Sequence, residues 1–171
     1  PVLNSSYWLT ESNYVGTFHR REFVVIDEAH LLQRTLLNFV EWGVSEGMLN
    51  SLGLVPPKSG ARSSTVSEWM VNHLKPAIKN SLKGIRGFDV RELRRANALQ
   101  AVLDRVDEVA EEIQRDTWVR DNKAGPLTYK PTDSSEWGQY IWSHADRFLL
   151  MSATIISSKT MADHLGLEDG Q

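Results

Sequence analysis

Two runs of consecutive hydrophobic residues dominate the pattern of apolar and polar positions. Phe23-Val24-Val25-Ile26 runs directly into Asp27-Glu28-Ala29-His30, and Phe148-Leu149-Leu150-Met151 runs into Ser152-Ala153-Thr154. Unbroken apolar runs of this length, rich in β-branched residues in the first case, predict strands, and we expect residues 23–26 to be a fully buried strand of a parallel sheet. Open α/β sheets bind ligands at the carboxyl ends of their strands, so the polar segments are candidate binding residues.

Elsewhere the apolar residues recur at helical spacing. The pattern over 31–42 predicts an amphipathic helix with Leu31, Leu32, Leu36, Leu37, Phe39 and Val40 as its apolar residues. A second helix should run from a cap at Ser64 or Thr65 to about Lys83, with a kink at Pro76. The longest helix should cover 89–115, capped by Asp89, with an apolar seam formed by Leu99, Val102, Val106, Val109 and Ile113.

The remaining segments predict shorter elements. Residues 118–120 and 127–130 flank a turn at 121–126 and should form a hairpin that ends at Pro131. We expect a strand that ends at Asn4 and leads into a helix, a short aromatic helix around 137–142, and a last helix over 158–166.

Composition limits the classes of protein that fit. The 171 residues allow one domain, or one domain with an insertion, and 41% hydrophobic content supports a core. The net charge of −3 does not indicate a protein that binds nucleic acid over its whole surface, so such binding must come from local patches. The absence of cysteine excludes disulfides and thiolate metal sites. With no apolar run of roughly 20 residues and no signal-peptide pattern, we expect a soluble, intracellular, cytoplasmic protein.

The residues after the first strand resemble a nucleotide site. Asp27-Glu28-Ala29-His30 is similar to the DEAH box of superfamily 2 helicases, and Ser152-Ala153-Thr154 resembles their motif III. The resemblance implies that Asp27 holds Mg²⁺ and that Glu28 polarises the water that attacks the γ-phosphate of ATP. It also implies that His30 and Ser152, Ala153 and Thr154 couple the nucleotide state to DNA binding.

The distance between the two motifs indicates an insertion. His30 and Ser152 are separated by 121 residues (152 − 30 − 1), far more than one crossover needs. We therefore expect an α/β fold in which a partial RecA-like parallel sheet domain, residues 1–42 and 134–171, carries a mainly helical insert over 43–133. This layout resembles the XPD/DinG family of helicases, whose Arch domain is inserted at this place.

Membership of that family would imply an ATP-dependent DNA helicase that moves 5′ to 3′ on single-stranded DNA. Many members also hold an iron–sulfur cluster through cysteines upstream of the DEAH box. The present sequence contains no cysteine. The phosphate-binding pattern GxxxxGK[ST] is absent as well. We therefore expect this chain to be a portion of a longer helicase and to have no ATPase activity alone.

The candidate DNA contacts follow the charge pattern. Residues 73–95 contain seven Lys or Arg against two acids, a local charge of +5, whereas 104–121 contain seven acids against three arginines, a local charge of −4. The candidates are Lys75, Lys79, Lys83, Arg86, Arg91, Arg94 and Arg95, with Asn4 and Tyr7 from the N-terminal segment. The basic residues could equally form a solvated face. Tyr7 and Trp8 could stack on a base, although such residues more often belong to the core.

Other interpretations of the same residues stay open. The acidic pair could cap a helix, and Ser-Ala-Thr could be an ordinary turn. A zinc site fits poorly, because none of the five histidines has the spacing of a zinc motif. The insert could be mainly a docking module for a protein partner, or the chain could be a clamp on nucleic acid that does not hydrolyse ATP.

Overall fold

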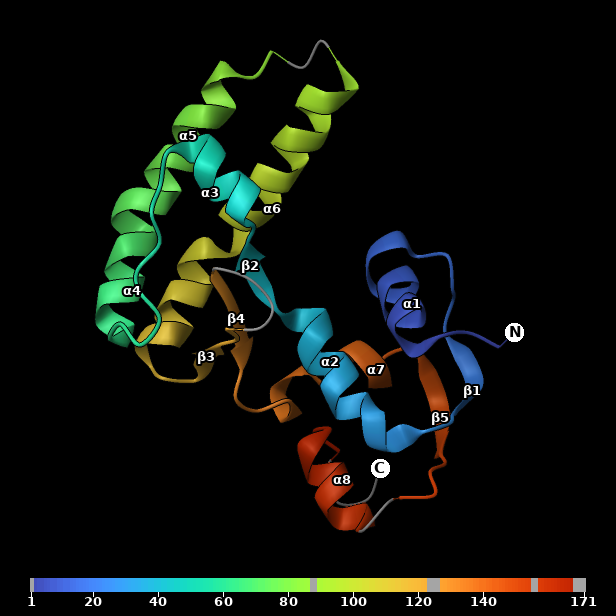
Figure 1. Cartoon of the computed structure of the whole chain (residues 1–171). Coiled ribbons are helices and arrows are strands. Elements are labelled where there is room, and N and C mark those ends of the chain that lie inside the picture. Colours follow the sequence, from blue (N-terminus) through green and yellow to red (C-terminus); the bar gives the residue numbers. More distant parts are fainter. Residues whose placement is uncertain (1, 87–88, 123–126, 155–156, 168–171) are drawn as a thin grey trace. The chain divides into compact units, whose positions relative to one another are not determined.

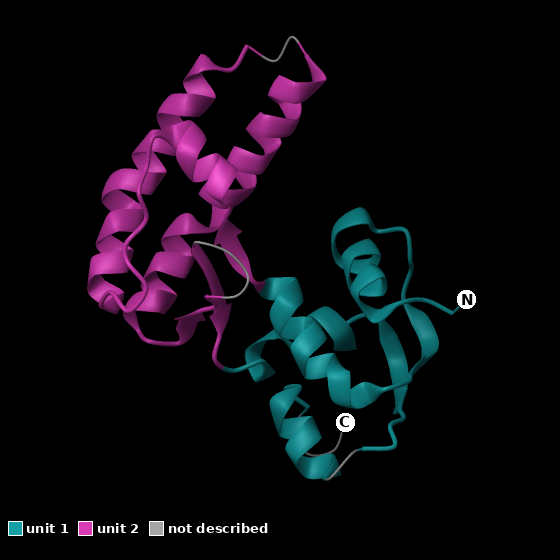
Figure 2. Ribbon diagram, in the orientation of Figure 1, with its two compact units in different colours: residues 1–40, 133–171 teal, residues 41–132 magenta. Residues whose placement is uncertain are grey.

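The computed structural model describes residues 2–86, 89–122, 127–154 and 157–167. The fold mixes helices and strands (Figure 1) and divides into two compact units (Figure 2). Unit 1 consists of residues 1–40 and 133–171, and unit 2 of residues 41–132. These boundaries lie one or two residues from those predicted. In the described residues, no helix combines the length and apolarity needed to cross a membrane.

Unit 1 contains the two predicted strands, paired in parallel. Strand β1 (Arg21–Ile26) lies beside β5 (Ala145–Leu150), with Val24 opposite Phe148 and Ile26 opposite Leu150. The prediction that residues 23–26 are fully buried is wrong, because Phe23 and Val25 are 55% and 48% exposed. Alternate side chains of a strand point to opposite faces, and only the face with Val24 and Ile26 packs on the core.

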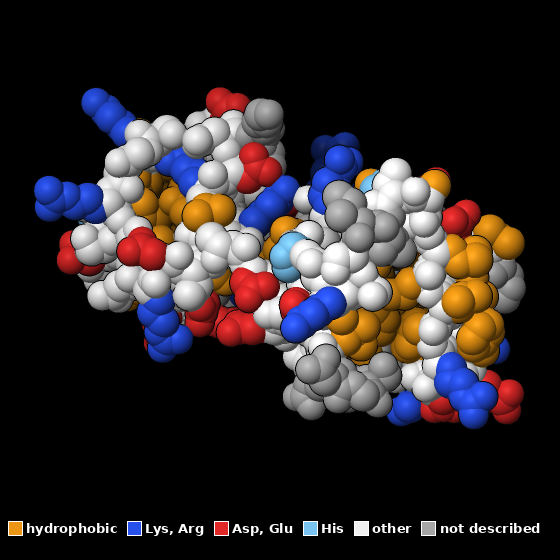
Figure 3. All heavy atoms as spheres, turned by 90° about the horizontal axis from the view of Figure 1, so that it is seen from below, with side chains coloured by type: hydrophobic (Ala, Val, Ile, Leu, Met, Phe, Trp, Pro, Cys, Tyr) orange, Lys and Arg blue, Asp and Glu red, His pale blue; other side chains and the backbone are white. Residues whose placement is uncertain are grey.

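The other face of this strand pair is apolar and open. Leu149, on β5, and Met151, directly after it, are also exposed. They lie beside Phe23 and Val25 of β1. Hydrophobic side chains gather accordingly on the surface of unit 1 at the right of Figure 3. Parallel strands are usually covered on both faces, so this arrangement is unusual for a parallel sheet.

Helices cover the inner face of the pair. They are α1 (Ser5–Thr10), continued by a π-helical turn over Glu11–Val15, then α2 (Leu32–Val40), α7 (Gln139–Trp142) and α8 (Ser158–His164), with 3₁₀ turns at Ala29–Leu31 and Ser135–Trp137. The helix expected over 31–42 is confirmed as α2. Buried Leu9, Ile26, Ala29, Leu32, Leu36, Val40, Ile141 and Leu165 form one core.

The N-terminal segment differs from the prediction. Residues 2–4 do not form a strand. Asn4 instead caps α1, because its side-chain oxygen accepts hydrogen bonds from the backbone N–H groups of Ser6 at 2.9 Å and Tyr7 at 3.4 Å. Asparagine is among the preferred residues at this position, and its local side-chain bonds compete with strand formation.

Asn13, in the π-helical turn after α1, joins this helical segment to Tyr140 and His144. The Asn13 amide nitrogen donates to the carbonyl oxygens of Leu9 at 2.9 Å and Tyr140 at 3.0 Å. Its amide oxygen lies 2.9 Å from His144 Nε2, which is therefore placed to donate. Burial lowers the pKa of His144 and so favours the neutral ring, in which a proton on Nε2 makes this bond.

The C-terminal end of α8 and Leu165, which follows it, pack closely on residues 134–142. Trp142 Nε1 donates to the Leu165 carbonyl at 2.7 Å, and Ser134 Oγ donates to the His164 carbonyl at 2.5 Å. Gly138 lies so near that a Cβ there would overlap the Leu165 carbonyl oxygen. The approach of the two backbones therefore requires a residue without a side chain at position 138.

Unit 2 combines four α-helices with a small antiparallel sheet, among its described residues. The helices are α3 (Glu46–Leu52), α4 (Ser63–Trp69), α5 (Lys75–Gly84) and α6 (Val90–Gln114), with a π-helical turn at Met70–Leu74 between α4 and α5. The strands β2 (Trp42–Val44), β4 (Leu127–Pro131) and β3 (Trp118–Arg120) pair in that order. The predicted 118–120/127–130 hairpin is confirmed, although Pro131 still pairs with Trp118. Its turn at 123–126 lies outside the described residues.

The helices of unit 2 pack through the predicted seam. Leu99, Val102, Val106, Val109 and Ile113 of α6 are buried, as are Val66, Met70, Leu74 and Ile78 from the α4-to-α5 segment. The predicted cap at Ser64 or Thr65 is wrong, because α4 begins at Ser63. Near Pro76 the chain widens into the π-helical turn, where the Lys75 N–H donates to the Met70 carbonyl. This turn accommodates a residue that has no N–H of its own.

We predict that Gly138→Ala destabilises the chain while Gly47→Ala does not. A methyl group at 138 would meet the Leu165 backbone and Trp142 Nε1, whereas one at 47, inside α3, would meet no atom within 4 Å. Alanine also favours helix over glycine by about 1 kcal/mol. Urea unfolding of both variants measures the difference, and equal stability of Gly138→Ala and the wild type would contradict the close packing.

Candidate functional site

The parallel register brings the two polar segments to one edge of the strand pair. Ile26 lies opposite Leu150, so both strands end at the same level. Beyond them the Met151 N–H donates to the Ile26 carbonyl and the Ala29 N–H donates to the Met151 carbonyl, each at 2.9 Å. These two bonds hold the residues after β1 against the residues after β5. Asp27–His30 and Ser152–Thr154 therefore form one group at the carboxyl edge.

Two exposed carboxylates begin this group. Asp27 Oδ1 accepts a hydrogen bond from the Glu28 N–H at 2.8 Å, which orients the Asp27 carboxylate at the end of β1. Glu28 has φ 50° and ψ 42°, the left-handed conformation that residues with a Cβ rarely adopt. The cost of this conformation is about 1 kcal/mol, and such strain concentrates at functional sites. It turns the chain sharply, so that Glu28 leaves the direction of the strand.

His30 lies between the two motifs. Its Nδ1 lies 2.8 Å from Ser152 Oγ and 3.2 Å from Glu28 Oε2. When Nδ1 carries a proton it can donate to either oxygen, and when it does not it can only accept from the Ser152 hydroxyl. The tautomer of His30 therefore decides whether Glu28 is bound to the ring. A change at Glu28 can reach Ser152 through this one nitrogen.

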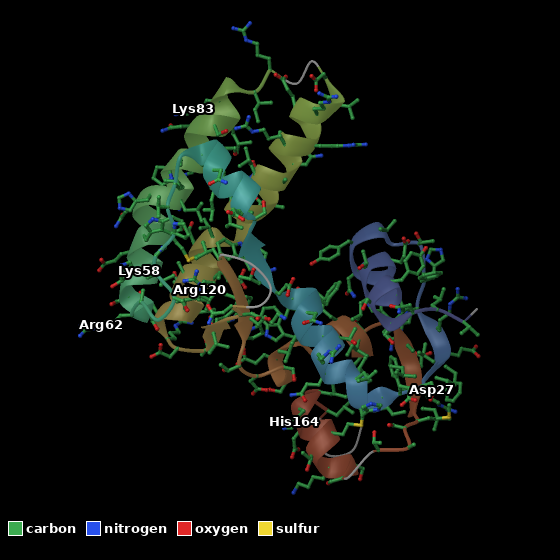
Figure 4. The ribbon with its side chains drawn as sticks, in the orientation of Figure 1. Asp27, Lys58, Arg62, Lys83, Arg120 and His164 are labelled. Carbon is green, nitrogen blue, oxygen red and sulfur yellow. The ribbon has the colours of Figure 1, made fainter. Side chains whose placement is uncertain are left out.

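Ser152 and Thr154 extend the network along the second motif. The Thr154 N–H donates to Ser152 Oγ at 3.2 Å, and the two hydroxyls lie 3.3 Å apart. Ala153 is exposed and occupies the position between them. The structure thus brings together Glu28, His30, Ser152 and Thr154 in one hydrogen-bonded chain. Figure 4 marks Asp27 at the end of β1 that faces this group.

Two hollows of unit 1 adjoin these residues. One of about 270 Å³ is lined by Ala29, His30, Gln33, Thr154, Ser157, Thr160, Met161, His164 and Leu165. Another of about 570 Å³ runs along β1 and is lined by Val2, Leu3, Ser5, Trp8, Phe18, Arg21 and residues 23–27. Gln33, Thr160 and His164 line the first hollow although no sequence motif predicts them as site residues. No local pattern marks them, because they reach the hollow from α2 and α8.

The donor set at β1 fits a magnesium ion. Mg²⁺ is commonly bound through one or two carboxylates, with the remaining positions taken by water and phosphate oxygens, and the exposed Asp27 carboxylate is suitable. In the part of the chain that the structure describes, no three His, Asp or Glu side chains converge as a complete metal site. A magnesium ion at this edge would have the exposed Asp27 carboxylate as its ligand from β1.

The predicted DNA-contacting residues of unit 2 do not share one environment. Lys75 Nζ lies 2.7 Å from Asp107 Oδ1 and 2.5 Å from Asp107 Oδ2, so this lysine pairs with α6 inside the unit. Arg95 Nη2 donates to Ser81 Oγ at 3.3 Å. The other five, Lys79, Lys83, Arg86, Arg91 and Arg94, are exposed, and no ion pair within the described residues involves them. Lys83 is marked on α5 in Figure 4.

The two N-terminal candidates also differ. The side-chain oxygen of Asn4 accepts its two capping bonds within α1, so this oxygen is already engaged. Tyr7 is 51% exposed and meets the ring of Phe18 edge to face, with centroids 6.4 Å apart. The alternative that Tyr7 belongs to the core is therefore wrong, and its ring is accessible for stacking.

No protein-family model matches this chain, and no curated protein matches it significantly.

We predict that Glu28→Gly is more stable than Glu28→Ala by roughly 1 kcal/mol. Both variants remove the carboxylate and its contact with His30, and only glycine also relieves the left-handed strain. Chemical unfolding measures the difference in free energy of unfolding between the two variants, which reports the cost of the left-handed backbone. If the alanine variant is the more stable of the two, the residue is not strained.

Proposed function

We propose that this chain is part of an ATP-dependent DNA helicase of the XPD/DinG type. Unit 1 would be the portion of the first RecA-like domain that contains the DEAH box and motif III. Unit 2 would be the Arch-like insert. The observation that carries the proposal is the contact of His30 with both Glu28 and Ser152, because it joins the two motifs through one side chain.

The residues divide the chemistry between them. Bound Mg²⁺ would neutralise charge on the phosphates of ATP during hydrolysis. Asp27 would hold that ion from the end of β1. Glu28, turned away from the strand by its left-handed backbone, would accept a proton from the attacking water. No sequence in this chain cradles the phosphates, so a complete site needs groups from elsewhere in the helicase.

The same contacts suggest how hydrolysis is coupled to movement. When Glu28 turns to the attacking water, it releases His30 Nδ1, which keeps its contact with Ser152. Ser152 in turn accepts from the Thr154 N–H, so a change in the His30 proton reaches the backbone after β5. Ala153, between the two hydroxyl residues, moves with them. This path is short and entirely within unit 1.

The open face of the strand pair agrees with a larger sheet. Phe23, Val25, Leu149 and Met151 expose an apolar surface that isolated parallel strands do not tolerate well. In a RecA-like domain helices would cover this face, and further strands would pair at the edges of the sheet. The alternative of a clamp that does not hydrolyse ATP is less favoured, because both acids needed for hydrolysis are present and exposed at the strand end.

We predict that Glu28→Gln, in the helicase that contains this chain, slows ATP hydrolysis by roughly 10²-fold with little change in ATP binding. The amide cannot accept the proton of the attacking water. Glu22→Gln, an exposed position at the start of the same strand, is the matched control and should leave turnover unchanged. Near-normal turnover of Glu28→Gln would remove Glu28 from this role. Asp27→Asn should instead weaken the dependence on Mg²⁺.

We also predict that Lys79→Ala/Lys83→Ala lowers the salt dependence of single-stranded DNA binding. Each lysine that neutralises a phosphate contributes about 0.7 to the slope of log K against log salt, so the double variant should lose up to about 1.4. Lys75→Ala is the control, because Lys75 is already paired with Asp107 and should change stability rather than the slope. Titrations of labelled oligo(dT) at several salt concentrations measure the slopes. An unchanged slope in the double variant would exclude this face from DNA contact.

A further inference from the structure

Helix α5 ends and α6 begins at one end of unit 2 (Figure 1). Exposed aliphatic side chains lie there among arginines and lysines. Val90 is 62% exposed and Leu93 is 50% exposed. They lie three residues apart on α6 and therefore on one face of the helix. We call Val90 and Leu93, with the basic residues Arg86, Arg91 and Arg94, the tip surface.

The tip surface is held together from both helices. Arg95 Nη2 donates to Ser81 Oγ at 3.3 Å, so the start of α6 lies beside the end of α5. Asp89 caps α6 by accepting from the N–H groups of Arg91 and Glu92, which fixes the first turn that carries Val90 and Leu93. The apolar pair is therefore presented on an ordered helix.

The charge around the pair is unbalanced. Residues 79–95 contain six Lys or Arg and two acids, a net charge of +4 (6 − 2). Asp89 is occupied as the helix cap, and the described part of the chain offers Lys83, Arg86, Arg91 and Arg94 no ion-pair partner. A partner at this surface must therefore be acidic.

The apolar pair favours a protein over single-stranded DNA. Proteins bind single strands largely by stacking bases on aromatic rings, whereas the exposed apolar side chains described on this turn of α6, Val90 and Leu93, are aliphatic. Burial of valine and leucine against other large apolar side chains instead stabilises a complex. Arginines around an apolar centre are also a common composition of protein interfaces.

We propose that the tip surface binds an acidic protein segment that carries large apolar side chains. The acids of the segment pair with Arg91 and Arg94, and its apolar side chains cover Val90 and Leu93. This binding requires neither ATP nor the residues at the end of β1. It assigns to the tip a partner different from the DNA proposed for Lys79 and Lys83 along α5.

The test uses two labelled synthetic peptides with the same number of glutamates. One carries leucine and phenylalanine at helical spacing, and the other has serine at those positions. We predict that the apolar peptide binds the wild type at least about tenfold more tightly, a difference that burial of two aliphatic side chains supplies readily. Fluorescence anisotropy at fixed salt measures both dissociation constants.

Matched variants locate the binding. In Val90→Ser/Leu93→Ser the dissociation constants of the two peptides should differ by no more than about twofold. Val71→Ser/Val119→Ser removes two exposed aliphatic side chains elsewhere in unit 2 and should leave the preference unchanged. Arg91→Glu/Arg94→Glu should weaken the binding of both peptides. Circular dichroism checks that each variant stays helical.

Four results would overturn the proposal. They are equal affinity of the wild type for the two peptides, absence of binding to the apolar peptide, loss of the preference in the Val71→Ser/Val119→Ser control, and self-association of the wild type that Val90→Ser/Leu93→Ser abolishes. The last would make a second copy of the chain the occupant. If instead Val90→Ser/Leu93→Ser weakens oligo(dT) binding and leaves the peptides unaffected, the tip is a DNA surface.

Discussion

The parallel pairing of β1 with β5 is the constraint on which the candidate site depends. The two strands are far apart in the sequence, and their register, with Ile26 opposite Leu150, sets where each polar segment emerges. A shift of one residue would turn every side chain of a strand to the opposite face. It would also break the bonds between Met151 and Ile26 and between Ala29 and Met151. The meeting of His30 with Ser152 follows from this register.

Closing so long a loop costs less than its length suggests, because the entropic cost rises only with the logarithm of the number of residues. Unit 2 reduces the cost further, since it is itself folded and its own β2, β4 and β3 join its two ends into one sheet. Trp42, at the beginning of the unit, lies opposite Tyr129, near its end. The chain therefore leaves unit 1 and returns to it from neighbouring strands.

The packing of neighbouring residues explains the strained position in the site. Glu28 is held in the left-handed region although a Cβ opposes it, and the cost is met by the core residues on either side. Ile26 and Ala29 are both buried, so the turn between them must be short. The surrounding packing thus imposes the conformation that directs the carboxylate toward His30. In unit 2 a comparable constraint acts on Lys75, which Asp107 withdraws from the exposed basic residues.

Periodicity and composition by themselves determined the main elements of this protein: the two strands that end in polar motifs, the amphipathic α2, the seam of α6 and the hairpin. These are properties of local spacing, which the sequence displays directly. The short strand β2 was not predicted, because three residues are too few to establish an alternating pattern and Gly43 favours a break. Its position depends on close approach to Thr128, a contact over more than eighty residues of sequence.

Only the tertiary structure decided which predicted residues act together. The sequence placed Asp27, Glu28, His30 and Ser152 at strand ends, but the shared Nδ1 of His30 required the register of β1 and β5. It predicted one basic face, but pairing across helices separated Lys75 from Lys79 and Lys83. It predicted a fully buried strand, but exposure of Phe23 and Val25 depends on what packs against the second face. Side-chain partners and the covering of a surface arise from distant segments, and local patterns do not encode them.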